Sequence, residues 1–106
     1  MQTLLIITNL PDRAAAEQLA RMLVHRRQAA CVNILPSISS TYHWQDEIET
    51  AEETPVWIKT AEDRYFEVEA TIREFHPYQT PEIISLPVSQ GLPDYINWVL
   101  AETRHP

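Results

Sequence analysis

The sequence predicts an α+β fold, a ferredoxin-like βαββαβ sandwich followed by a C-terminal helix. Three observations lead to this fold class. Four stretches have the apolar or alternating composition of strands, two amphipathic segments separate them in the order that a split β-α-β plan requires, and a third amphipathic segment ends the chain. With 106 residues the chain is long enough for one domain, which we expect to span residues 1–106.

The first strand and the first helix are predicted from two patterns. Residues 3–8 form a short continuous apolar run, which is typical of a strand buried on both faces. Asp12 can cap a helix that follows and has apolar residues at i, i+3 and i+4 on one face. Arg26 and Arg27 fall in the expected last turn of that helix, where the helix dipole favours cations.

A long hairpin is predicted in the middle of the chain. One arm runs over residues 31–44 and the return arm over residues 48–60, with an interruption at Pro55. A turn centred between residues 45 and 46 places Pro36 opposite Pro55, which indicates a break shared by both arms. The inner half of this hairpin is apolar, whereas the outer half is rich in carboxylates. The carboxylates of residues 46–53 either collect cations loosely or form a charged, solvated edge that resists aggregation, and we expect the edge.

A second helix is expected after the hairpin. Thr60-Ala61-Glu62-Asp63 has the form of a capping box, with Asp at the fourth position. The helix should end near Phe75, because Pro77 and Pro81 each fix their own φ and restrict the preceding residue. The two prolines therefore bracket a short rigid loop.

The remaining elements lead to a prediction about assembly. A strand over residues 83–88 precedes a third helix that begins at Pro93. Residues 3–8 and 83–88 are largely apolar on both faces, but two helices cover only one face of a four-stranded sheet. The outer hairpin also carries Tyr42 and Trp44, large apolar side chains that an isolated two-stranded ribbon cannot bury. We therefore expect the chain to form an oligomer.

Charge and composition exclude several classes of partner. The net charge is −7, and residues 46–74 carry ten carboxylates against three basic residues. Such a surface repels phosphate backbones, and no basic stripe with interleaved aromatic residues is present, so we expect no nucleic-acid partner. No apolar run approaches the roughly 20 residues of a membrane helix. With one cysteine and no signal-peptide pattern, we expect a soluble cytoplasmic protein.

The loop over residues 75–82 is the predicted site, because it holds an imidazole, a phenol and a carboxylate on a stiff scaffold. His76 either ligates a metal or bonds a backbone group and fixes the loop. With Glu82 and Tyr78 it supplies one strong ligand and one carboxylate, so further metal ligands would come from a neighbouring subunit. Cys31 is either a thiolate ligand or a small buried hydrophobe.

Other polar residues give weaker signals. Lys59, the one lysine, either binds an anion or forms a structural ion pair. His76 and Glu82 have the residue types of a general base and its orienting carboxylate, but no nucleophile elbow and no glycine-rich phosphate loop accompanies them, so we expect no enzymatic activity. We expect His25 and His105 to be surface residues or partners of a helix dipole.

Short motifs recur along nearly the whole chain: Pro11-Asp12, Ala29-Ala30-Cys31-Val32-Asn33, Tyr42 with Trp44, Ile58-Lys59-Thr60, the run from His76 to Ile83, and Tyr95-Ile96-Asn97-Trp98. Together they resemble the CutA divalent-cation tolerance proteins. The resemblance implies a compact homotrimer of ferredoxin-like subunits, with the sheets facing inward, the hairpins interlocking and clefts between subunits.

The resemblance also implies a function in tolerance of copper and other divalent cations, with no obligatory cofactor and with copper or zinc as the candidate metals. The residues that would serve at such clefts are Cys31, Tyr42, Trp44, Lys59, His76, Tyr78 and Glu82. Some bacterial members have Cys and His, associated with copper, where this chain has Thr8 and Phe75. The alternative is a trimeric small-ligand sensor or protein-interaction module related in plan to PII signalling proteins.

Overall fold

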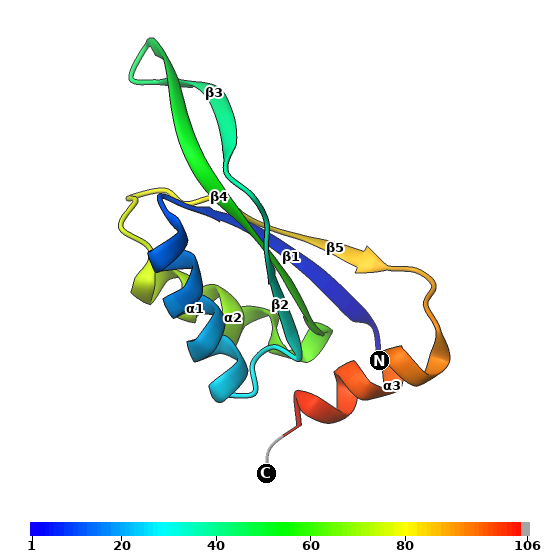
Figure 1. The fold of residues 1–106 in the computed structure, drawn as a ribbon. Coiled ribbons are helices and arrows are strands. Elements are labelled where there is room, and N and C mark those ends of the chain that lie inside the picture. The colour runs from blue at the N-terminus through cyan, green and yellow to red at the C-terminus, as the bar shows by residue number, and fades with distance from the viewer. Residues whose placement is uncertain (105–106) are drawn as a thin grey trace.

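The structure is a computed structural model that describes residues 1–104 (Figure 1). The prediction for His105 therefore lies outside the described residues. The elements in chain order are β1 (Thr3–Leu10), α1 (Arg13–His25), β2 (Cys31–Ile34), β3 (Ile38–Trp44), β4 (Glu47–Ala61), the short 3₁₀ helix η1 (Glu62–Arg64), α2 (Tyr65–Phe75), β5 (Ile83–Val88) and α3 (Pro93–Glu102). This order confirms the predicted α+β plan with its C-terminal helix.

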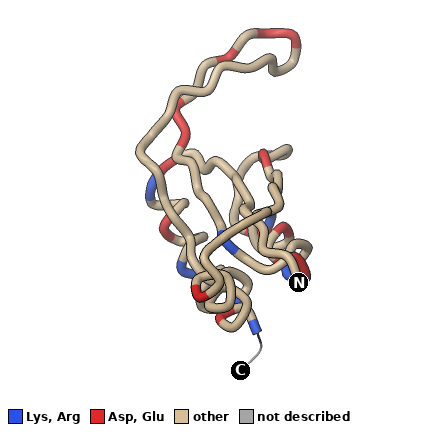
Figure 2. The backbone as a smooth tube through the Cα atoms, turned by 90° about the vertical axis from the view of Figure 1, so that its right-hand side faces the viewer, with Lys and Arg blue, Asp and Glu red and all other residues tan. Residues whose placement is uncertain are grey.

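The sheet has the order β2-β4-β1-β5, and all of its pairings are antiparallel. This is the strand order of a ferredoxin-like sandwich. β3 pairs only with the outer part of β4, so these two strands project beyond the sheet as a ribbon (Figure 1). α1 and α2 lie together on one face of the sheet (Figure 1). Figure 2 shows acidic residues along the projecting ribbon, as the charge pattern predicts.

The core lies between that face and the two helices. Ile6 of β1 is paired with Ile58 of β4, and both are fully buried with Leu19 and Leu23 of α1 and Ile72 of α2. Alternation along the strands places every second residue in this core and the residues between on the opposite face. The predicted apolar face of the first helix is confirmed, because Leu19 and Leu23 of α1 are buried in this core.

The start of α1 is as predicted, but its end is not. Asp12 accepts a hydrogen bond at Oδ1 from the Ala15 backbone N–H, at 2.8 Å. The helix ends at His25 because Arg27 is left-handed, with φ of 57°. The N–H groups of Arg27 and Gln28 then bond the carbonyls of Val24 and Leu23, at 3.0 Å each. These bonds form a Schellman motif, which takes Arg26 and Arg27 out of the last turn.

The hairpin turn is confirmed. Gln45 and Asp46 both have positive φ, 51° and 67°, which is the geometry of a two-residue type I′ turn. Outside the break, Trp44 pairs with Glu47. Inside it, Ile34 pairs with Val56, a register displaced by one residue from that of the outer ribbon. The arm containing Pro36 therefore holds one extra residue at the break, which the predicted symmetric pairing did not include.

The predicted interruption of the return arm at Pro55 is wrong, because β4 runs unbroken from Glu47 to Ala61. In an antiparallel strand the N–H and C=O of one residue face the same neighbour. The Pro55 carbonyl accepts a bond from the Leu35 N–H at 3.0 Å, so its missing N–H faces the break around Pro36. The proline therefore removes no bond from the ladder with β1.

The predicted capping box at residues 60–63 is also wrong. The Thr60 hydroxyl instead donates to the Gln28 carbonyl at 2.6 Å, since β4 continues through Ala61. η1 follows, and α2 then begins at Tyr65 without a side-chain cap. Thr60 and Ala61, the first two residues of the expected capping box, therefore belong to β4 and cannot cap a helix.

The face opposite α1 and α2 is only partly covered. α3 packs against β4 and β1, near the N-terminus of the chain (Figure 1). Beyond it, Trp57, Ile84 and Leu86 remain 39%, 49% and 45% exposed. This exposed apolar face is the feature from which the sequence predicts an oligomer. Within residues 1–104, no helix is long and apolar enough to cross a membrane.

Candidate functional site

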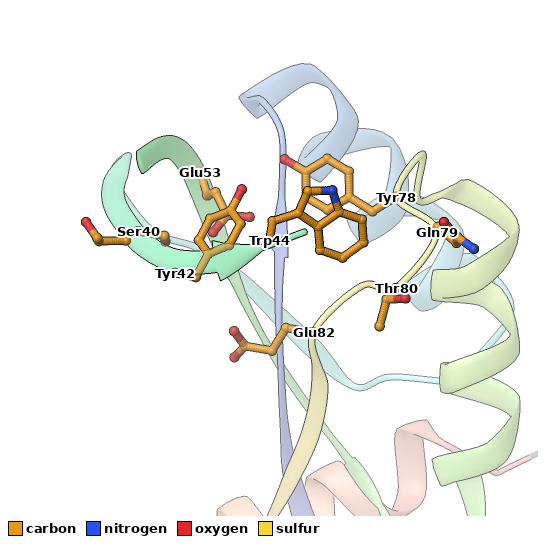
Figure 3. Close-up of a pocket in the computed structure, with 9 residues that line it drawn as sticks. Ser40, Tyr42, Trp44, Glu53, Tyr78, Gln79, Thr80 and Glu82 are labelled. Carbon is orange, nitrogen blue, oxygen red and sulfur yellow. The ribbon is translucent and has the colours of Figure 1, made fainter. Parts of the chain in front are cut away.

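A cavity of about 550 Å³ lies between the projecting ribbon and the loop that follows α2 (Figure 3). Its lining residues are Ser40, Thr41, Tyr42, Trp44, Glu53, Tyr78, Gln79, Thr80 and Glu82. Four of the predicted site residues, Tyr42, Trp44, Tyr78 and Glu82, are therefore brought together in one chain. They come from β3 and from the loop, two segments that are far apart in the sequence.

His76 holds the loop against the end of β1. The residue is 7% exposed, and Nε2 lies 2.6 Å from the Asn9 carbonyl oxygen. Nδ1 accepts a bond from the Tyr78 backbone N–H at 3.1 Å, which assigns the ring proton to Nε2 as donor. The ring also packs against that of Tyr78, with centroids 4.6 Å apart. These are the contacts of the loop-fixing alternative, and a metal at His76 would have to displace one of them.

Glu82 is tied to the same residue of β1. Its Oε1 accepts a bond from Asn9 Nδ2 at 3.2 Å. Asn9 therefore holds both ends of the loop, His76 through its backbone carbonyl and Glu82 through its side chain. The carboxylate is exposed to solvent and lines the cavity. It can accept a further bond or bind a cation there.

Cys31 and Lys59 lie elsewhere in the chain. They are direct partners across β2 and β4, and neither lines the cavity. The Lys59 ammonium lies 5.8 Å from the centre of the Tyr95 ring of α3, a cation–π distance. No carboxylate within residues 1–104 forms an ion pair with it. Cys31 is a free, half-buried thiol.

The part of the chain that the structure describes contains no group of three or more His, Cys, Asp and Glu side chains placed to hold a metal ion. His76, Glu82 and Cys31 thus do not form such a group within one chain. Metal ligation by any of them would need ligands from a second copy or from water.

Glu53 is the charged pocket residue that sequence reasoning missed. We predicted the carboxylates of residues 46–53 to form a solvated edge, but Glu53 is only 9% exposed and lines the cavity. The signal was present in the hairpin register, since Glu53 lies on the same side of the ribbon as Tyr42 and Trp44. Burial raises the pKa of Tyr78, and the nearby charge of Glu53 raises it further.

Comparison with known families gives a match over almost the whole chain. Residues 4–102 match the model of the CutA1 divalent ion tolerance protein family. The Divalent-cation tolerance protein CutA of Thermus thermophilus is 35% identical over 103 residues, which are 97% of this chain and 99% of that protein. The Protein CutA homolog of Xenopus laevis is 42% identical over 89 residues. The chain spans 59% of the Xenopus protein and 50% of Protein CutA of Mus musculus.

Solved structures agree with this match. The crystal structure of CutA from Xylella fastidiosa is 40% identical and superposes with a TM-score of 0.95, covering 98% of this chain and 100% of that one. CutA1 from Oryza sativa, 31% identical, also gives 0.95, over 100% and 97% of the two chains. A CutA from Archaeoglobus fulgidus, described as periplasmic, gives 0.94 at 31% identity over 96% and 99% of the two chains.

Proposed function

Because the chain belongs to the CutA1 divalent ion tolerance protein family, we propose that it contributes to copper or zinc tolerance by binding divalent cations weakly at clefts between subunits. The observation that carries this proposal is the family match over residues 4–102. The family is described by ion tolerance and not by a reaction, so the proposal contains no catalytic step.

Glu82 is the first ligand in this proposal, because its exposed carboxylate lines the cavity and accepts only one hydrogen bond, from Asn9. His76 is the second, and its ring must release Asn9 or Tyr78 before a nitrogen can bind a metal. Cys31 is the third and lies outside this cavity. We expect weak binding, because one carboxylate and an imidazole that is free only part of the time are a poor ligand set for copper and zinc, which prefer several nitrogen or sulfur ligands.

The proposed assembly is a homotrimer, which would bring further ligands to the clefts. Two exposed apolar surfaces support it: the sheet face with Trp57 and Leu86, and the outer ribbon, where Ile48 is 69% exposed. We propose the cytoplasm as its compartment, on the sequence pattern alone.

Replacing Glu82 by glutamine is expected to weaken copper and zinc binding about tenfold, because a carboxylate is exchanged for a neutral amide at a cation site. Calorimetric titration of the metal-free protein measures this change. Glu47→Gln is the matched control, since Glu47 is exposed near the tip of the ribbon and does not line the cavity. Equal binding by wild type and both variants would assign the cations to the general acidic surface and refute the proposed site.

His76→Gln separates the two alternatives for His76. A structural role predicts a lower melting temperature and unchanged metal affinity, since the variant loses the bonds that fix the loop to β1. A ligand role predicts a loss of metal affinity at temperatures where the variant is folded.

The second candidate function is a small-ligand sensor. The aromatic cavity beside the loop favours it, because its volume falls within the range of about 300–1,000 Å³ that is typical of ligand sites. Its aromatic lining is also typical of such sites.

A further inference from the structure

Glu53 is a largely buried residue whose carboxylate has no side-chain partner within residues 1–104. It is 9% exposed, and none of the ion pairs within residues 1–104 involves it. The described residues donate no side-chain hydrogen bond to it either, whereas Glu82 has Asn9. Its carboxylate oxygens still reach the solvent of the cavity, and a carboxylate in such a poorly solvated place attracts a positive group. Its position in the wall of a cavity therefore calls for a positive group inside that cavity.

Three aromatic rings line the cavity with this carboxylate. Tyr42, Trp44 and Tyr78 are 41%, 43% and 38% exposed, so part of each ring is free for contact. Figure 3 shows Glu53 beside Tyr42, with Trp44 and Tyr78 next to them. Burial raises the pKa of Tyr78, and the nearby Glu53 and Tyr42 raise it further. Aromatic faces attract cations through the ring quadrupole.

The charge of the cavity lining has one sign. Glu53 and Glu82 are its two charged residues, and no lysine, arginine or histidine is among the nine that line it. Two carboxylates are too few to replace the six or more oxygens around a calcium ion. The lining of one chain has no imidazole or thiolate, so copper or zinc would bind here only weakly unless other subunits add ligands. A cation with an apolar surface matches both the carboxylates and the rings.

We propose that this cavity binds a small organic cation with a methylated or quaternary ammonium group, held over Tyr42, Trp44 and Tyr78 and paired with Glu53. The inference rests on the small-ligand form of the proposed function and names its ligand class. Quaternary ammonium groups cannot donate hydrogen bonds, so recognition comes from ring faces and from an opposite charge. Both are present at this cavity.

Choline and its neutral isostere 3,3-dimethyl-1-butanol are the probes that separate charge from shape. The metal-free full-length protein, in its native assembly, is titrated with each and followed by calorimetry. We expect saturable choline binding and at least about tenfold weaker binding of the neutral isostere, because only choline has the charge that attracts Glu53 and the rings.

Two variants test the residues. Glu53→Gln keeps the side-chain shape and is expected to weaken choline binding about tenfold, whereas Trp44→Leu should weaken it about fivefold. Glu52→Gln is the matched control, because Glu52 is the exposed neighbour of Glu53 on the same strand and does not line the cavity. Circular dichroism checks that all three variants are folded.

Absence of saturable choline binding would overturn the inference, as would equal affinity for the neutral isostere or unchanged affinity in folded Glu53→Gln. A pocket filled by a basic side chain of a second copy would also overturn it, and would appear as altered sedimentation of Glu53→Gln without choline binding. Copper and zinc titrations of the same samples test the metal proposal independently. Metal binding without choline binding rejects only the choline inference, and choline binding without metal binding rejects only the metal proposal.

Discussion

Replacing Leu86 by aspartate is expected to convert the proposed homotrimer into monomers. Leu86 is 45% exposed on the sheet face away from α1 and α2, opposite Leu5 of β1. If that face is buried between subunits, the change removes about 1.5–3 kcal/mol of apolar burial from each protomer and adds a charge that must be desolvated. Sedimentation velocity measures the result as a fall in mass toward the 12.3 kDa of one chain.

Phe66→Asp is the control for this substitution. Phe66 is 80% exposed on α2, on the opposite side of the molecule from the sheet face, so its replacement should leave the oligomer intact. The proposed assembly is refuted if wild type sediments as a monomer, or if Leu86→Asp sediments like wild type.

Replacing Arg64 by methionine is expected to lower the free energy of unfolding by about 2–4 kcal/mol, because it removes charge-assisted hydrogen bonds at a buried site. Arg64 is 5% exposed. Its Nε donates to the Thr103 carbonyl at 2.7 Å, and its guanidinium bonds Glu67 at 2.6 Å. Without it the carbonyl of the fully buried Thr103 loses the Arg64 donor, and the end of α3 loses one of its attachments to the segment before α2. Urea unfolding at one fixed protein concentration measures the change.

Arg104→Met is the matched control for Arg64. Arg104 pairs with Asp63 through two bonds of 2.7 and 2.9 Å, but both side chains are more than two-fifths exposed, so we expect a loss below about 1 kcal/mol. The bond from Arg104 holds the pKa of Asp63 below its ordinary value of 3.8. The pair's contribution is therefore present above pH 3.8 and lost as pH falls through the lower folded value. Equal losses in the two variants would refute the special role of Arg64.

The topology could be predicted because local signals agreed with it. Asp12 caps α1, the turn at residues 45 and 46 sets the outer hairpin register, and the apolar strands identify the exposed sheet face. The errors came from effects between segments that local patterns do not contain. Pro55 leaves β4 unbroken because its missing N–H faces the break around Pro36. Thr60 bonds Gln28 instead of capping a helix.

The candidate site was predicted in part for the same reason. The loop from His76 to Glu82 could be located from its prolines and polar side chains, but its attachment to Asn9 depends on packing across the sheet. Glu53 was misplaced because a run of carboxylates suggests solvent. Only its register opposite Ile38, on the side of the ribbon that faces the loop, accounts for its burial.

The proposed role in divalent-cation tolerance is tested most directly by growth in graded copper and zinc. Cells of the source organism that lack this chain are compared with the same cells carrying wild type, Glu82→Gln or Glu47→Gln at equal protein levels. We expect that loss of the chain lowers the tolerated metal concentration, and that wild type and Glu47→Gln restore it but Glu82→Gln does not. Identical growth of all strains in both metals would contradict the proposed function.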